Sequence, residues 1–503
     1  MNPPRQHTVV IIGAGPTGIT TATLLAQYGI ATLVLDRWDG VYPQPRAVHL
    51  DDEVYRIVER LGIGSQFAAI SRPAVGLRLL DPHMKVLAEF HRDPAQSRNG
   101  YPQANMFDQP EFEALLRANL RNYPLVTLRG NAEVSDIVDD GARTRITFTD
   151  RVDGTEHTVE ADYLLGCDGA NSLVRRRIGS AMRDLNFEQR WLVVDVASTV
   201  DLHQWAGVHQ VCNPRRAGTF MQIGDVRYRW EFRLLPGETA ADFATIAALR
   251  PLIAPWTASA DDSQLELIRV TEYTFRAQIA DRWRRGNTFL LGDAAHLTPP
   301  FVGQGMGAGL RDAMNLSWKL AGVINGTLDP SALDTYEQER KPHARKLIDL
   351  ALTVGRAMTA GGRVGDLLRR TVVPKMHLLP GMRGKVLDSQ TPPLPGSSLI
   401  HKTRARGQLA GTLCPNMVIN GRRLDSVLGD GFTVVTTRGL SPEDHSAVTG
   451  RGGTAYVAEP GTELATWLAH GSADAAIIRP DRTVMRAGRD VAELCRSLPT
   501  ALC

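Results

Sequence analysis

Residues 8–36 read TVVIIGAGPTGITTATLLAQYGIATLVLD and contain one complete β-α-β unit. The β-branched run 8–12 predicts a buried parallel strand, 16–27 an amphipathic helix, and 31–35 a second buried strand. Residues 13–18, GAGPTG, have the glycine spacing of a dinucleotide-binding turn between strand and helix. The sequence therefore predicts an α/β fold whose first domain binds a dinucleotide.

Three glycines and one acid give this turn its expected chemistry. Gly13 permits the tight turn, Gly15 lets a pyrophosphate approach the backbone, and Gly18 lets helix and strand pack closely. The start of the helix directs unpaired N–H groups and the positive end of its dipole toward phosphates. Asp36 ends the second strand, where its carboxylate can accept hydrogen bonds from an adenosine ribose. FAD and NAD share this ADP half, so the unit alone does not choose between them.

A second motif occupies residues 289–307, FLLGDAAHLTPPFVGQGMG. A short apolar strand ends in Gly292 and Asp293, and a helical pattern from about Ala308 to Ile324 follows the glycines. Asp293 can bind ribityl hydroxyls. The amides at the helix start can face the N1–C2=O edge of an isoalloxazine ring and stabilise the anionic reduced flavin.

This motif, together with YLLGCDGANS at residues 163–172, resembles the para-hydroxybenzoate hydroxylase-like flavoprotein monooxygenases. Similarity to the hydroxyphenylpropionate hydroxylases within that family is found at residues 42–53, 191–196, 229–232, 236–238, 333–340 and 343–344. The resemblance implies FAD as the cofactor, NADH or NADPH as the co-substrate, and a role for Asp168 in binding both.

The residues predicted to contact FAD come from these motifs and from the family pattern. Arg46 and Gln109 are carried over from the family, and an arginine can also offer charge-assisted hydrogen bonds to phosphate. The full set is Gly13, Gly15, Pro16, Thr17, Gly18, Asp36, Arg37, Arg46, Gln109, Asp168, Gly292, Asp293, Pro300, Gly303, Gly305, Met306 and Gly307.

The activity that the resemblance implies is single-component aromatic hydroxylation. NAD(P)H reduces FAD, O2 adds to give a C4a-hydroperoxide, and the distal oxygen attacks a small phenolic substrate. No second glycine fingerprint follows a strand, so NAD(P)H is expected to dock without a domain of its own. His49, in the same family stretch as Arg46, is a candidate base for ionising the phenol. A purely structural histidine is the alternative.

The middle of the chain, residues 183–280, alternates in the manner of an antiparallel sheet. In the stretch 227–234, aromatic and aliphatic side chains share one strand face and charged side chains the other. Two interpretations are open: the charged face is solvated, or one of its arginines pairs with a substrate carboxylate. The predicted substrate contacts are Arg227, Arg229, Trp230, Arg233 and Pro299.

The predicted fold is a Rossmann-like FAD-binding domain with an inserted antiparallel-sheet substrate domain and a C-terminal thioredoxin-like α/β domain. Its parts are residues 1–182 (FAD-binding, with a substrate-domain segment near 72–103), 183–280 (substrate), 281–345 (FAD-binding), 346–396 (helices and linker) and 397–503 (thioredoxin-like). The last part has no CxxC pair, so dithiol chemistry is not expected. We interpret it as structural and as a candidate homodimer interface.

The amino-acid composition limits the kinds of partner and the location that we expect. The 57 Lys and Arg residues are interspersed with 54 Asp and Glu residues, and the net charge of +3 predicts no nucleic-acid partner. Five scattered cysteines lack metal-ligand or scaffold spacing, which predicts no metal site and a cytoplasmic location. No apolar run is long enough to span a membrane, and the N-terminus lacks the pattern of a signal peptide.

Two other functions fit the same motifs. One is an FAD monooxygenase acting on a polycyclic, polyketide-like phenol. The other is a flavin-binding regulator without turnover. The Trp-x-Trp-x-Ile-Pro signature of flavin halogenases and the CxxxxC pair of disulfide oxidoreductases are absent from the sequence.

Overall fold

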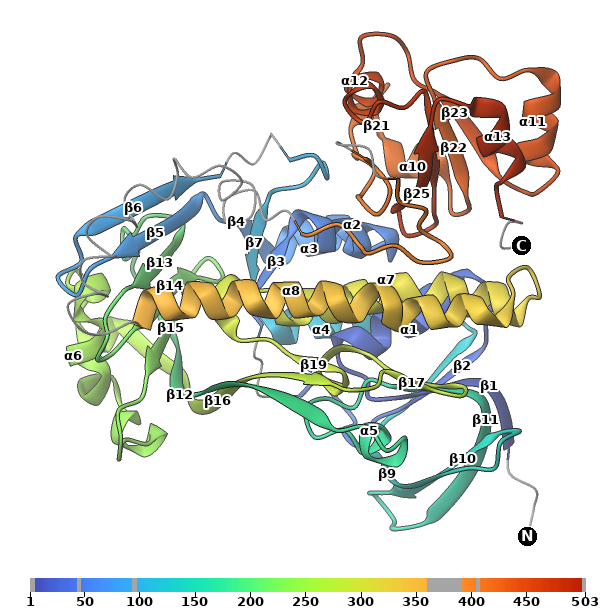
Figure 1. Cartoon of the computed structure of the whole chain (residues 1–503). Coiled ribbons are helices and arrows are strands. Elements are labelled where there is room, and N and C mark those ends of the chain that lie inside the picture. The colour runs from blue at the N-terminus through green and yellow to red at the C-terminus, as the bar shows by residue number, and fades with distance from the viewer. Residues whose placement is uncertain (1–4, 43–46, 93–96, 360–390, 404–407, 500–503) are drawn as a thin grey trace.

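The computed structural model describes residues 5–42, 47–92, 97–359, 391–403 and 408–499. Figure 1 shows two sheet-containing regions side by side, a pair of long helices of which one reaches from the first region to the second, and a separate C-terminal domain. The cofactor and substrate motifs of the sequence all fall in the first two regions.

The first sheet has eight strands and contains the predicted β-α-β unit. β1 runs parallel to both β2 and β11, and its last four residues are fully enclosed, as the β-branched run predicts. β9 (Ala132–Asp139) and β10 (Thr144–Asp150) extend the sheet from β11 in antiparallel fashion. The main path is β17 (Arg284–Arg285), β18 (Thr288–Leu290), β11 (Glu156–Gly166), β1 (Arg5–Ile12), β2 (Thr32–Leu35) and β8 (Val126–Arg129).

Helices cover this sheet and carry the cofactor motifs. α1 (Pro16–Gln27) follows the glycine turn and packs against α7 (Gly305–Ile324), which begins three residues earlier than the sequence pattern indicated. α8 (Asp334–Thr359) runs beside α7 and reaches the second sheet (Figure 1). The shorter helices are α2 (Asp52–Arg60), α3 (Gly64–Ile70), α4 (Gln109–Asn119) and α5 (Leu173–Arg177).

The second sheet is built mainly from the middle of the chain. Its neighbours are antiparallel apart from the parallel pair β13–β5. β5 and β6 come from the segment near residues 72–103, earlier in the chain than the other strands of this sheet. The order is β19 (His296–Leu297), β16 (Leu265–Ala280), β12 (Met182–Ser198), β15 (Arg227–Arg233), β14 (Gly218–Gln222), β13 (Val208–Val211), β5 (Gly76–Leu80) and β6 (Val86–His91).

The two faces of β15 have different surroundings. Trp230 and Phe232 pack in a core with Phe220 and with α6 (Ile246–Thr257), which confirms the apolar face. The charged face is not solvated, because Arg229 and Glu231 are both buried. The interpretation of that face as solvent-exposed is therefore wrong for the centre of the strand.

A small three-stranded sheet connects the two regions. It consists of β3 (His49–Asp51), β7 (Ala104–Phe107) and β4 (Ser71–Pro73), in that order, and all its pairs are antiparallel. β3 leads directly into α2, whose first turn is capped by the Asp51 side chain. The segment that carries His49 is thereby fixed at the junction of the two larger sheets.

The C-terminal domain is a four-stranded mixed sheet with helices. The sheet order is β23 (Thr454–Val457), β22 (Thr433–Thr436), β24 (Ala475–Ile478) and β25 (Val484–Gly488), and β20 (Val418–Ile419) and β21 (Arg422–Arg423) form a separate ribbon. The helices are α10 (Leu424–Leu428), α11 (Pro442–Thr449), α12 (Glu463–His470) and α13 (Val491–Arg496).

Buried charges fasten this domain to the rest of the molecule. Glu339 on α8 accepts hydrogen bonds from Lys319 Nζ of α7 at 2.8 Å and from Arg479 Nη1 at 2.9 Å. All three side chains are fully enclosed. Because removing one member of a buried ion pair is costly, this contact fixes the domain against α7 and α8.

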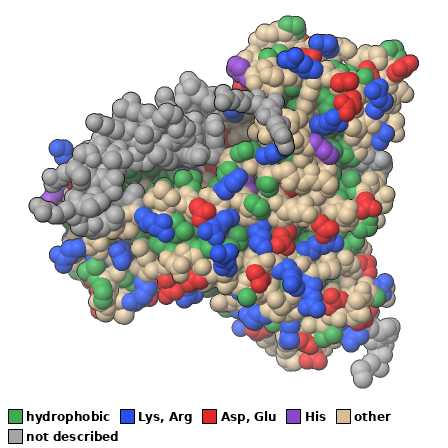
Figure 2. Space-filling view, in the orientation of Figure 1, with side chains coloured by type: hydrophobic (Ala, Val, Ile, Leu, Met, Phe, Trp, Pro, Cys, Tyr) green, Lys and Arg blue, Asp and Glu red, His purple; other side chains and the backbone are tan. Residues whose placement is uncertain are grey.

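The surface and the helices set further limits. On the face drawn in Figure 2, basic and acidic side chains are intermixed over most of the described surface. Among the helices of the described residues, none combines the length and the apolarity that a membrane crossing requires. The same residues contain no cluster of three His, Cys, Asp or Glu side chains suited to hold a metal ion.

Candidate active site

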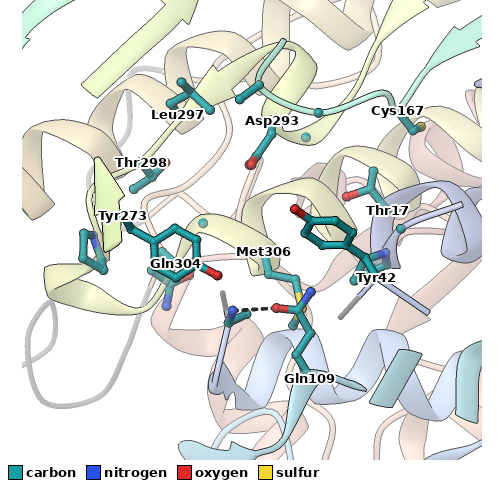
Figure 3. A pocket seen from close by; sticks show the side chains of 18 of the residues that line it. Thr17, Tyr42, Gln109, Cys167, Tyr273, Asp293, Leu297, Thr298, Gln304 and Met306 are labelled. Carbon is teal, nitrogen blue, oxygen red and sulfur yellow. Dashed lines mark hydrogen bonds between the residues drawn. The ribbon is translucent and has the colours of Figure 1, made fainter. Parts of the chain in front are cut away.

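A cavity of about 1030 Å³ lies where the first sheet, the second sheet and the start of α7 meet. Its lining includes the glycine turn after β1, the Gly-Asp segment after β18 and the inner face of the second sheet. In Figure 3, Asp293, Tyr42 and Gln109 point toward one another across open space, with Tyr273 at the other side of the view. The motifs that are distant in sequence thus converge on one space.

The glycine turn has the geometry that its spacing predicts. Gly13 has a φ of 103°, and a Cβ there would lie 2.3 Å from the Cys167 carbonyl oxygen. A Cβ on Gly18 would lie 1.9 Å from the Gly13 carbonyl oxygen, so helix and turn are in direct contact. Gly15 faces open space, and it precedes α1 without a side-chain cap. The amides at the start of α1 are therefore available to a ligand anion.

Asp36 and Gln109 both line the cavity near this turn. Asp36 Oδ2 accepts a hydrogen bond from the Ala14 amide at 2.5 Å, and Oδ1 accepts one from Trp38. Gln109, the first residue of α4, accepts from the Ala47 amide at 2.6 Å (Figure 3). Both side chains line the cavity, and each carboxylate or amide oxygen has a second lone pair for a ligand.

The Asp168 segment is organised around its own carboxylate. Asp168 accepts hydrogen bonds from Ser172 Oγ at 2.5 Å and from the Leu173 amide at 2.6 Å, which caps α5. Burial raises the pKa of Asp168 despite these donors. Arg175 then donates to the Ala294 carbonyl at 2.9 Å and so ties this segment to the Gly-Asp motif. Asp168 itself lines the cavity, and the tie through Arg175 was not predicted.

Asp293 is held in place by a residue that the sequence reasoning missed. Asp312 on α7 accepts hydrogen bonds from the Gly292 amide at 3.0 Å, from His296 Nε2 at 2.8 Å and from Arg340 Nε at 2.8 Å. Burial opposes the charge of Asp312, but His296 and Arg340 bring its pKa below the ordinary value. This buried network fixes the backbone from which Asp293 reaches the cavity.

A second buried network fixes the start of α7. Arg311 donates to Asp51 at 2.5 Å, and Gln304 donates to the same carboxylate at 2.8 Å. The sequence contained one indication of both networks. In an otherwise apolar helix, polar residues recur at helical spacing, at positions 311, 312, 315 and 319. Gly303, with a φ of 63°, turns the chain into α7 against the His49 ring.

His49 lies between the two ends of the cavity. Its Nδ1 is 3.4 Å from the Gly303 carbonyl oxygen. Burial and the charge of Arg92 lower the pKa of His49 to about 4, against an opposing effect of Asp51. The ring is therefore neutral at physiological pH, and as a base it is weak.

The arginines predicted to bind substrate do not line this cavity. Arg229 is fully enclosed and makes two hydrogen bonds to Asp195, at 2.6 and 2.9 Å. Arg227 pairs with Asp108, which precedes α4. Arg233, Trp230 and Pro299 are also absent from the lining. Acids from other segments, Asp108 and Asp195, neutralise Arg227 and Arg229.

Other residues of the same sheet form the substrate end of the cavity. Its aromatic wall includes Trp191 and Phe301, whose ring centroids are 5.8 Å apart, with Tyr273 and Phe275 beside them. Its polar residues are Gln210, Thr219 and Glu231 from three successive strands. Glu231 lies in β15, whose alternating pattern is visible in the sequence. Which of its charged residues faces the cavity depends on how the strand is paired with its neighbours.

Comparisons with known proteins identify the family. The model of the FAD binding domain family matches residues 6–351. The chain belongs to this family of FAD-dependent monooxygenases. One relative, 3-(3-hydroxy-phenyl)propionate/3-hydroxycinnamic acid hydroxylase 2 of Burkholderia vietnamiensis, is 34% identical over 86% of this chain and 79% of its own length. The 3-(3-hydroxy-phenyl)propionate/3-hydroxycinnamic acid hydroxylase of Mycolicibacterium gilvum is 34% identical over 96% of this chain and 85% of its own length.

Solved structures show the same fold. The flavin-dependent monooxygenase PieE, in complex with FAD and substrate, has a TM-score of 0.82 at 22% identity and covers 99% of this chain and 98% of its own. Aklavinone-11 hydroxylase, with FAD and aklavinone, has a TM-score of 0.79 at 22% identity and the same coverage. The predicted α/β fold of the chain, including the C-terminal domain, is confirmed.

The geometry of the cavity residues is suited to bind FAD. Gly15 faces open space, the start of α1 lacks a side-chain cap, and Asp293 points into the cavity (Figure 3). Of the predicted contacts, Gly18 and Gly307 pack behind the lining, and Arg46 lies outside the described residues. Those that line the cavity are Gly13, Gly15, Pro16, Thr17, Asp36, Arg37, Gln109, Asp168, Gly292, Asp293, Pro300, Gly303, Gly305 and Met306.

The cofactor and the protein divide the chemistry. When bound, FAD accepts a hydride from NAD(P)H and activates O2, and the protein orients the ring to be hydroxylated and excludes water. The uncapped start of α1 suits the pyrophosphate, and the amides at the start of α7 suit a region of negative charge on the reduced ring. The aromatic wall lies at the opposite end of the same cavity, where a substrate ring can stack.

Proposed function

We propose that this FAD-dependent monooxygenase hydroxylates a small phenol that carries a carboxylate side chain, of the 3-(3-hydroxyphenyl)propionate type. The observation that carries the proposal is the aromatic substrate end of the FAD cavity. The names of the relatives at 30–34% identity agree with it.

The aromatic wall suits a single substituted ring. The Trp191 ring packs against both Phe275 and Phe301, with centroid distances of 6.2 and 5.8 Å. Such side chains favour offset or edge-to-face packing against an aromatic ligand. A phenol held there lies between the Gly-Asp motif and the inner face of the second sheet.

Arg92 is the proposed partner of the substrate carboxylate. It follows β6, lines the cavity, and is close enough to His49 to lower the pKa of that ring. Among the other lining arginines of the described residues, Arg117 donates to the Ala14 carbonyl of the glycine turn and Arg176 to the Asn171 carbonyl. Arg276 pairs with Glu188, and Arg37 lies over the Trp38 ring. A guanidinium matches a carboxylate in shape and charge.

The test is a substrate panel with the FAD-loaded protein. 3-(3-Hydroxyphenyl)propionate, the neutral 3-ethylphenol and a polycyclic hydroxyquinone are each scored for accelerated NAD(P)H oxidation and for a product with one added oxygen. The proposal expects the phenolic acid to give the highest kcat/KM. Preference for the polycyclic phenol would support the alternative substrate class, and no stimulation by any phenol would support a regulator without turnover.

We also propose that the enzyme acts in the cytoplasm as a homodimer with the C-terminal domain at its interface. The intermixed surface charges and scattered cysteines support a cytoplasmic setting. Light scattering of the full chain, and of a variant with charge reversals on exposed residues of α11, tests the dimer. A monomeric mass for the unaltered chain would contradict it.

A further inference from the structure

Glu231 is a buried carboxylate that faces the substrate end of the cavity. It lies in the middle of β15, and the residue is 7% exposed. No side-chain hydrogen bond or ion pair of Glu231 occurs among the described residues. A buried acid without a donor is expensive unless something else supplies that donor.

The other buried acids of the described chain show how unusual this is, because each has a polar partner. Asp195 bonds to Arg229, Asp312 to His296 and Arg340, and Glu339 to Lys319 and Arg479. The full set of partnered acids is Asp51, Asp52, Asp108, Glu113, Asp195, Asp312, Glu339 and Asp481. Glu231 differs from all of them in facing the cavity without such a partner.

A neighbouring amide repeats the pattern. Gln210 lies two strands away in the same row, with Thr219 between them, and all three side chains line the cavity. Gln210 Nε2 donates to the Phe301 carbonyl at 3.1 Å, while its buried Oε1 has no hydrogen-bond donor among the described residues. Two acceptors thus face the cavity, and a ligand that carries hydroxyl donors would satisfy them.

The charges around Glu231 favour a carboxyl that exchanges protons. Burial and Asp195 on β12 raise its pKa, against an opposing effect of Arg229 on β15. Arg229 and Arg269 of β16 are both held by Asp195, and Arg227 is held by Asp108. β14 and β13 present only Thr219, Met221, Val208 and Gln210 to the cavity. Because a raised pKa makes a carboxylate a stronger base than an ordinary one, Glu231 is suited to take a proton from a phenol.

We propose that Glu231 is the base that takes the proton of the substrate's phenolic hydroxyl. The phenol O–H bond breaks, its electron pair stays on the phenolic oxygen, and a carboxyl O–H bond forms on Glu231. The phenolate pushes electron density onto the ring carbon that receives the oxygen atom. Once the oxygen has been transferred, the proton returns to a hydroxyl oxygen of the product. This inference rests on the proposed phenolic substrate.

The test compares E231Q with E266Q in the FAD-loaded enzyme. Glutamine keeps the shape of Glu231 but cannot take the proton, and Glu266 is an exposed acid of β16, outside the cavity lining. We expect E231Q to lower the hydroxylation rate by about 10²-fold or more and to abolish the acidic limb of its pH profile. E266Q should match the unaltered enzyme in both.

A second readout needs no turnover. A nitrophenol analogue of the substrate has a visible phenolate band, and the unaltered enzyme should bind it as phenolate below the pH at which the free analogue ionises. E231Q should bind it as the neutral phenol. An unchanged band and pH profile in E231Q would overturn the role of Glu231. If no phenol stimulates NAD(P)H oxidation by the unaltered enzyme, the proposed function fails. The phenolate band of the bound analogue then still shows whether Glu231 takes the proton.

If E231Q does not fold, the unaltered enzyme alone decides. The phenolate band of the bound analogue is then followed against pH. Binding as phenolate across the range in which Glu231 is ionised supports the proposal, and binding only as neutral phenol overturns it.

Discussion

The two ends of the cavity are built in different ways. The flavin end is formed by contiguous segments, at 13–18, 168–174 and 292–306, each folded around its own backbone. The substrate end is formed by single residues from separate strands, such as Trp191, Gln210 and Glu231. Cofactor geometry therefore follows from short motifs, whereas substrate chemistry depends on strand register and on which partner covers each charge.

The largest effect is expected at the flavin end, from Gly18→Val. A side chain there would collide with the Gly13 carbonyl oxygen, from which even a Cβ would be only 1.9 Å away. Because backbone has to move, we expect a protein without FAD and with a lowered Tm, measured by absorbance and thermal melting.

The matched control is Gly15→Ala. Its Cβ meets nothing within 4 Å, so the empty protein should melt as before while FAD affinity falls. Normal FAD loading in the Gly18→Val protein would show that the close packing of turn and helix is not required.

The next effect is on the network behind Asp293. Asp312→Ala leaves Arg340 and His296 buried without their acid. Loss of one member of a buried ion pair costs about 3–5 kcal/mol, which urea unfolding measures. The comparison is Asp349→Ala, which breaks an exposed pair with Arg345 and should cost about 0.3–0.5 kcal/mol. Equal costs would mean that Asp312 does not hold the cofactor backbone.

At the substrate end, Arg92→Gln separates charge recognition from ring recognition. We expect KM for 3-(3-hydroxyphenyl)propionate to rise about 10-fold or more, since a charged hydrogen bond contributes about 1.5–3 kcal/mol. KM for 3-ethylphenol should stay within twofold of the unaltered enzyme. A parallel rise for both phenols would remove Arg92 as the carboxylate partner.

A substitution of His49 tests the role of the histidine between the two ends of the cavity. Its pKa is about 4 in the folded protein and 6.5 in an ordinary environment. Between these values the unfolded chain binds a proton that the folded chain does not, so stability falls as pH falls through that range. We expect His49→Gln to reduce the loss of Tm between pH 7 and pH 5. It should leave the pH profile of hydroxylation above neutrality unchanged, and a changed profile there would restore His49 as a catalytic candidate.

The smallest effect is expected from Arg233→Ala. Arg233 is half-buried and lies outside the cavity lining, so KM for the phenolic acid should not change. A rise in KM that spares the neutral phenol would bring back the prediction that this strand binds the carboxylate.

The sequence predicted what depends on neighbours along the chain. The turn at Gly13, the start of α1 and the apolar face of β15 depend on local spacing and alternation, and all three were predicted. The roles of Arg229 and Glu231 depend on Asp195, which is 34 residues from Arg229, and on the register of three strands. Alternation placed these residues on one face, but it could not show that one is neutralised and the other faces the cavity.

Oxygen transfer by the FAD-loaded enzyme under ¹⁸O2, with NAD(P)H and 3-(3-hydroxyphenyl)propionate, tests the proposed hydroxylation most directly. We expect this phenol to accelerate NAD(P)H oxidation and the product to contain one ¹⁸O atom on the ring. Stimulation by no phenol, or a product whose new oxygen comes from water, would contradict it.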